Sequence, residues 1–186
     1  MAEKKEKKTV PLESMGIHDR LSGLYNQRFF DHQLGLAVER AKRKLSPLCL
    51  LMFCFDHFEE YREMVGDSQE FNQVTVKLGE VVKSAIRRID QAFRLEGEIF
   101  SIIVDSDLYQ AKIIAKRIKD SLSQTAFLLK KPAGTPLLAY KTISVGIAEL
   151  EFTKKHQDLL RNAHDAMFIA KCSGGDQINI HRSFLT

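Results

Sequence analysis

Residues 87–100 read R-R-I-D-Q-A-F-R-L-E-G-E-I-F, and the rest of the chain is organised around this stretch. The pattern is typical of a helix end, a short strand, a tight turn at Glu96, Gly97 and Glu98, and the start of a second strand. A glycine between polar residues suits a β-hairpin turn. Two carboxylates around that glycine also suit metal ligation. The local pattern leaves a solvated hairpin and a functional turn both open.

An ionic pair precedes this turn. Arg87 and Asp90 are three residues apart where the preceding helix is predicted to end, so we expect them on one helix face, with a cation beside an anion. Such a pair can clamp a ligand. An ordinary surface ion pair explains the same spacing in an arbitrary helix.

Composition limits the classes of protein to consider. The 186 residues, 44% of them hydrophobic, are enough for one well-buried domain. Four of the 28 basic residues lie within the first eight positions, and the rest of the chain is close to neutral. This distribution argues against a nucleic-acid-binding protein. We predict a flexible basic tail over residues 1–14, a single domain over residues 15–182 and a C-terminal tail over residues 183–186.

Cysteines and hydropathy indicate the compartment. Three cysteines without a C-x-x-C spacing favour a reducing environment over a disulfide framework or a zinc site. The N-terminus lacks the apolar core of a signal peptide, and no apolar run reaches the roughly 18 residues of a transmembrane segment. We therefore expect a cytoplasmic protein.

Periodicity predicts alternating helices and strands. Asn26 is a candidate N-cap for the first helix, and the continuous apolar run at residues 48–55 is typical of a buried central strand. Asp67 and Glu70 form a candidate capping box, and Pro132, Gly134 and Pro136 mark a loop. The predicted helices cover residues 27–41, 58–65, 71–87, 108–122 and 157–171, and the predicted strands cover residues 48–55, 92–95, 100–104, 139–148 and 177–181. This order predicts an α+β fold with helices on a mixed sheet.

Five motifs together resemble those of GGDEF domains, the bacterial diguanylate cyclase family. In chain order they are D-R-L-S-G-L-Y-N-Q-R at 19–28, F-D-H-F at 55–58, R-L-E-G-E-I-F at 94–100, T-I-S-V-G-I-A at 142–148, and H-D-A-M-F-I-A-K-C-S-G-G at 164–175. The resemblance implies the palm-like fold of nucleotidyl cyclases, with a central, mostly antiparallel sheet flanked by helices.

The metal-binding positions depart from the family pattern. The resemblance places Cys54 where active members have the first metal carboxylate, whereas Glu98 keeps the second. Asp56 lies two strand residues from Cys54, about 7 Å away, and cannot simply replace it. A neutral thiol is a poor Mg²⁺ ligand. Ile99, at the position of a family glutamate, can neither bind metal nor transfer a proton.

The nucleotide-binding positions depart as well. Glu96 replaces the first glycine of the turn and leaves only Gly97, and Glu59 replaces a lysine, so two negative charges face the triphosphate. The positions for guanine recognition are Arg62 and Phe71, and Lys171 remains while its partner arginine is Gly175. The resemblance thus implies a degenerate active site without enzymatic activity and without a cofactor, Mg²⁺ being relevant only to residual activity.

The spacing of Arg87 and Asp90 matches a second family site, because Asp90 is followed by five residues and then Glu96. In the family this R-x-x-D motif binds the product, cyclic di-GMP, so the resemblance implies a receptor for that nucleotide. An arginine can bond guanine or phosphate bidentately, and an aspartate can accept from guanine. Arg117 is the candidate third residue of this cyclic di-GMP-binding site, beside Arg87 and Asp90.

Three hypotheses about function are compatible with the sequence. The first is an inactive GGDEF-like signalling domain that binds cyclic di-GMP. The second is a ligand-free interaction scaffold that forms a homodimer or binds a protein partner. The third is residual cyclase activity on GTP through Glu98 and Asp56.

Overall fold

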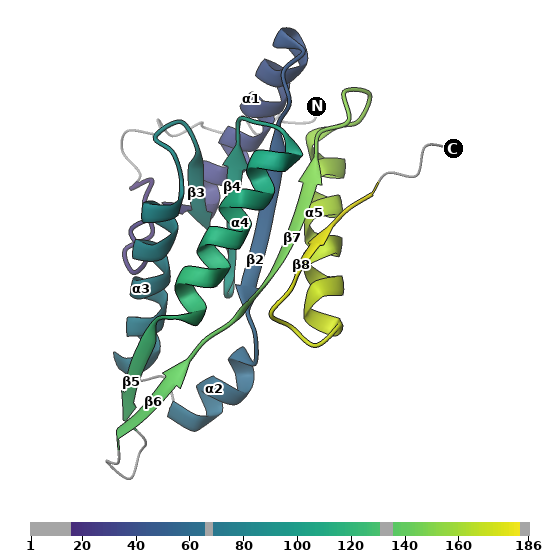
Figure 1. The fold of residues 1–186 in the computed structure, drawn as a ribbon. Coiled ribbons are helices and arrows are strands. Elements are labelled where there is room, and N and C mark those ends of the chain that lie inside the picture. The colour runs from purple at the N-terminus through teal and green to yellow at the C-terminus, as the bar shows by residue number, and fades with distance from the viewer. Residues whose placement is uncertain (1–15, 66–68, 131–135, 183–186) are drawn as a thin grey trace, which may run out of the picture.

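The computed structural model describes residues 16–65, 69–130 and 136–182 (Figure 1). The described residues leave out the whole predicted N-terminal tail, the C-terminal tail, Asp67 of the candidate capping box, and the loop positions Pro132 and Gly134. The side chains of Arg62, Glu70 and Phe71 also lie outside the description, although their backbones belong to helices.

A six-stranded sheet forms the centre of the molecule, in the order β1-β3-β4-β2-β7-β8. The inner pairs are antiparallel, and the two edge pairs, β1 with β3 and β7 with β8, are parallel. The strands are β1 (Tyr25–Asn26), β2 (Cys49–Phe55), β3 (Gln91–Arg94), β4 (Ile99–Val104), β7 (Ile143–Glu149) and β8 (Ile178–Ile180). The prediction of a mixed, mostly antiparallel sheet is confirmed.

Four of the helices described pack against the sheet, α2 lies beyond the end of β2, and a short two-stranded sheet lies to one side (Figure 1). The helices are α1 (Gln27–Lys44), α2 (Phe58–Val65), α3 (Gln69–Ala85), α4 (Leu108–Ser123) and α5 (His156–Cys172), and the second sheet pairs β5 (Ala126–Lys130) with β6 (Pro136–Tyr140). The predicted cap of α1 is confirmed, since the Asn26 side chain accepts a hydrogen bond from the Phe29 N–H at 3.1 Å. No helix within the described ranges is long and apolar enough to cross a membrane.

Strand β2 is buried along its whole length because helices cover both faces of the sheet. Its side chains alternate between two cores, as the period of two requires. Phe53 and Phe55 pack in the core beneath α3 and α4, whereas Met52 and Cys54 pack in the core beneath α1 and α5. Asp56 follows directly at the end of this strand.

Two predicted elements are wrong in extent. Helix α3 ends at Ala85, two residues before the predicted Arg87. The strand predicted over residues 139–148 is two strands in two sheets, because β6 pairs with β5 and β7 pairs with β2. Only two polar residues, Lys141 and Thr142, separate the two strands, and so short an interruption does not show in the sequence pattern that the pairing partner changes.

Candidate functional site

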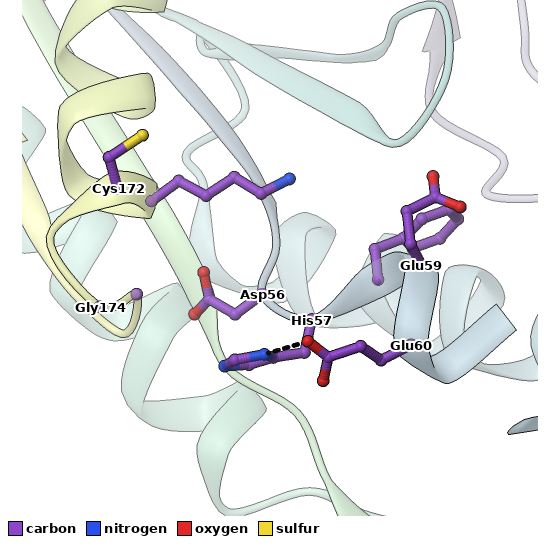
Figure 2. Close-up of a pocket in the computed structure, with 9 residues that line it drawn as sticks. Asp56, His57, Glu59, Glu60, Cys172 and Gly174 are labelled. Carbon is purple, nitrogen blue, oxygen red and sulfur yellow. Dashed lines mark hydrogen bonds and ion pairs between the residues drawn. The ribbon is translucent and has the colours of Figure 1, made fainter. Parts of the chain in front are cut away.

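Two adjoining pockets lie where β2 ends against α2 and the last turns of α5. The strand-end pocket, of about 340 Å³, is lined by Asp56, His57, Phe58, Glu59, Glu60, Lys171, Cys172, Gly174 and Gly175 (Figure 2). The turn pocket, of about 530 Å³, is lined by Cys54, Phe55, Phe58, Glu59, Gly97, Glu98, Ile99, His164, Met167, Phe168, Lys171 and Cys172.

The fold brings most of the predicted active-site positions together around these pockets. The positions that line them are Cys54, Asp56, Glu59, Gly97, Glu98, Ile99, Lys171 and Gly175. Glu96 is exposed on the β3–β4 turn and lines neither pocket, and its backbone N–H donates to Gln27 Oε1 at 3.3 Å. Gly97 has a φ of 66°, which a tight turn with a left-handed residue requires.

Asp56 is a structural hydrogen-bond centre. It is only 4% exposed, and its Oδ1 accepts from Ser144 Oγ at 2.6 Å. Its Oδ2 accepts from Thr142 Oγ1 and from the Asp176 N–H, both at 2.7 Å. The carboxylate thus ties the end of β2 to β7 and to the turn between α5 and β8. These three donors were not predicted, because they lie far from Asp56 along the chain.

The same contact explains the glycine that follows α5. Gly175 has a φ of 74°, and a Cβ placed on it would lie 2.7 Å from Asp56 Cγ. Any larger residue there would therefore have to displace the Asp56 carboxylate. Gly175 permits the close approach on which the hydrogen bonds of Asp56 depend.

Cys54 is buried and apolar in its surroundings. It is 5% exposed, and it lies opposite Ile99 in the β2–β4 pairing. Burial raises the pKa of Cys54, the Lys171 ammonium lowers it and the Asp56 carboxylate raises it, with a net upward shift. The thiol therefore stays neutral at physiological pH, and a neutral thiol is a poor ligand for a hard cation.

Glu98 is engaged in an ion-pair network. Arg94 donates to Glu98 Oε1 at 3.1 Å and to Asp19 Oδ1 at 3.3 Å, and all three side chains are largely shielded from solvent. Burial raises the pKa of Asp19, but hydrogen bonds from Ser22 and the charge of Arg94 bring it below its usual value. The network joins the β3–β4 turn to the segment before β1. Sequence reasoning did not single out Arg94 or Asp19, although both lie in the quoted motifs.

The residues at these positions do not fit the Mg²⁺ binding that the resemblance to GGDEF domains implies. One position carries a neutral thiol, the Asp56 carboxylate is filled by three protein donors, and the Glu98 carboxylate is paired with Arg94. Throughout residues 16–65, 69–130 and 136–182, no three His, Cys, Asp or Glu side chains are grouped so that they could hold a metal ion.

The predicted geometry of Arg87 and Asp90 is wrong. Because α3 ends at Ala85, both residues lie in the turn after the helix and not on one of its faces. Asp90 is 7% exposed, and its Oδ2 accepts from the Arg87 backbone N–H at 2.9 Å. The exposed Arg87 guanidinium instead donates to Gln110 Oε1 of α4 at 2.5 Å. Asp90 therefore shapes the turn that presents Arg87.

Arg117 lies exposed on α4, seven residues after Gln110. Seven residues are two helical turns, so Arg117 is on the same side of the helix, about 10 Å further along it. Lys119 of the same helix pairs with Asp176 at 2.8 Å, next to the Asp56 centre. Helix α4 therefore connects the Arg87 turn with the end of β2.

The three cysteines are expected to differ sharply in reactivity. Burial raises the pKa of Cys49 to about 12 and raises that of Cys54, while Cys172 is exposed. Because the thiolate is the reactive form, Ellman's reagent should label one thiol per native chain rapidly and all three in denaturant. Cys172→Ser should remove the rapid phase. Two rapid thiols in the native protein would contradict the burial of Cys54.

Comparison with known proteins identifies the family to which the chain belongs. The family described as "Diguanylate cyclase, GGDEF domain" matches residues 16–177. The chain is 28% identical to the diguanylate cyclase DgcS of Shewanella oneidensis over 85% of this chain and 50% of that protein. It spans half or less of the first curated relatives that it matches.

Solved structures share the fold. The GGDEF domain of DgcB from Caulobacter crescentus, crystallised in complex with c-di-GMP, has a TM-score of 0.81 at 23% identity, covering 91% of this chain and 98% of that one. Diguanylate cyclase SiaD from Pseudomonas aeruginosa, in complex with its activator SiaC, has a TM-score of 0.81 at 25% identity, covering 91% of this chain and 63% of that one. Both confirm the helix-flanked mixed sheet.

Proposed function

Because the chain belongs to the GGDEF domain family, we propose that it is a catalytically inactive member that binds cyclic di-GMP through Arg87 and acts as a cytoplasmic receptor or regulatory module. The observation that carries the proposal is a contrast between two sites. Around the two pockets, Cys54 carries a neutral thiol, Asp56 accepts hydrogen bonds from protein groups, and Glu98 is paired with Arg94. At the end of α3 an exposed arginine is held on an ordered turn.

The turn supports ligand binding through pre-organisation. Asp90 holds the backbone of Arg87 in place. The conformational entropy of that backbone is therefore lost on folding and not on ligand binding. On binding, Arg87 exchanges its contact with Gln110 for the guanine edge or phosphate of the nucleotide, where two parallel hydrogen bonds are available. Arg117 adds a second cation on the same side of α4.

Calorimetry with cyclic di-GMP tests this proposal. The wild-type protein should bind with a dissociation constant of roughly 1 µM or below, and Arg87→Ala should raise that constant at least about tenfold, since a charged hydrogen bond contributes about 1.5 to 3 kcal/mol. Arg88→Ala is the matched control, because Arg88 is exposed on the same turn and adjacent in sequence. An absence of heat with the wild-type protein would refute the receptor function.

A second candidate function is a protein-interaction scaffold. Exposed apolar side chains flank the Arg87–Gln110 contact in sequence: Ile89 is 64% exposed, Tyr109 68% and Ile113 42%. Large apolar side chains gathered near one site favour an interface with a second copy or another protein. Binding of such a partner that Arg87→Ala leaves unchanged would favour this alternative.

A further inference from the structure

The turn pocket has the size and lining of a small-molecule site. Its volume of about 530 Å³ lies within the roughly 300 to 1,000 Å³ that such sites occupy. Aromatic side chains enter from two elements, Phe58 at the start of α2 and Phe168 on α5, and the apolar Ile99 and Met167 complete the wall. These side chains provide surfaces for a flat ring, because aromatic and thioether groups pack favourably against aromatic faces.

The charges around the pocket leave one cation for a ligand. Glu98 shares Arg94 with Asp19, Glu60 Oε1 of the adjoining pocket lies 3.2 Å from His57 Nδ1, and Asp56 accepts hydrogen bonds from three donors. Lys171 is exposed and lines both pockets, and its ammonium has no ion pair or hydrogen bond with any of the residues that the structure describes. Lys171 therefore offers one ammonium partner to a ligand in this pocket.

A triphosphate is a poor match for the same surface. It would bring several negative charges to a pocket in which Lys171 is the one Lys or Arg side chain among the lining residues described. The residues near the pocket do not suit Mg²⁺, the ion that usually neutralises the charge of bound phosphates. A single carboxylate, in contrast, needs only one ammonium partner and leaves the rest of the ligand to apolar contact.

We propose that the turn pocket binds a small aromatic carboxylate, with its ring against Phe58, Phe168 and Met167 and its carboxylate on Lys171. The site is separate from the Arg87 turn and does not depend on cyclic di-GMP binding.

Titration by NMR or calorimetry with two probes of matched shape tests the proposal. Indole-3-propionate should bind with a dissociation constant of roughly 0.1 to 1 mM, as a fragment of its size allows, and tryptamine, of opposite charge, should bind at least fivefold more weakly. Amide shifts should centre on Ile99 and Met167. Equal binding of the two probes would overturn the role of Lys171, and GTP competing at the same residues would overturn the proposed ligand class.

Paired variants separate the charge from the apolar wall. Lys171→Gln should weaken indole-3-propionate at least fivefold and should not weaken tryptamine, whereas Lys112→Gln, an exposed lysine on α4, should have no effect. Phe168→Ala should weaken both probes, and Ile169→Ala, its exposed neighbour outside this pocket, should weaken neither. Lys171→Gln should also leave cyclic di-GMP binding unchanged, so failure here is distinguishable from failure of the receptor proposal. Unchanged indole-3-propionate affinity in both Lys171→Gln and Phe168→Ala would overturn the site.

Discussion

Incubation of the purified chain with GTP and Mg²⁺ or Mn²⁺ should produce no detectable cyclic di-GMP. The reaction requires metal ions that neutralise the phosphates and activate the attacking oxygen. Here Cys54 is a buried neutral thiol and Asp56 is filled by protein donors, while Ile99 cannot transfer a proton. Loss of one electrostatic contact at an active site costs about 10² to 10³ in rate. Several losses together should place the product below detection.

The assay needs an active diguanylate cyclase as a positive control at the same protein concentration, with the product separated by chromatography. Formation of cyclic di-GMP by this chain would contradict the proposal. In that case Glu98→Gln would show whether the carboxylate now paired with Arg94 takes part. Activity lost in that variant would assign the reaction to this site, and activity retained would indicate a contaminating enzyme.

Asp56→Ala should lower the free energy of unfolding by roughly 3 to 4 kcal/mol. The substitution removes the acceptor of three hydrogen bonds in a buried site and leaves the donors of Thr142 and Ser144 without it. Urea denaturation followed by circular dichroism should show a lower midpoint with an unchanged slope. Asp56→Asn should lose less, since an amide oxygen still accepts one or two of these bonds.

Asp105→Ala provides the control for that measurement. The Asp105 side chain is 36% exposed, and its ion pair with Arg40 is long, at 3.7 Å. Its removal should change the unfolding free energy by no more than about 0.5 kcal/mol. A similarly small loss in Asp56→Ala would mean that the Asp56 carboxylate is dispensable for folding. Its availability as a metal ligand would then have to be reconsidered.

Local patterns predicted most elements but missed some connections. The N-cap at Asn26 and the buried run of β2 were read correctly because caps and unbroken apolar strands depend on neighbouring residues. Strand β1 has only two residues, and β5 lies in a segment for which no strand was predicted. The break between β6 and β7 was missed because it spans only Lys141 and Thr142, and local patterns do not show a change of pairing partner.

The order of the five motifs is a property of the chain alone, and it was enough to place the chain in the family. The residue types at 54, 59, 96 and 99 predict an inactive site, and that stays a prediction. The role of Asp56 depends on donors that are 86, 88 and 120 residues away, which only folding brings to one carboxylate. Because α3 ends early, Asp90 accepts a hydrogen bond from the Arg87 backbone N–H and does not form the expected ion pair. The Arg87 guanidinium donates to Gln110 of α4. Helical spacing describes neighbours on one element, whereas these contacts join elements whose approach is set by packing across the sheet.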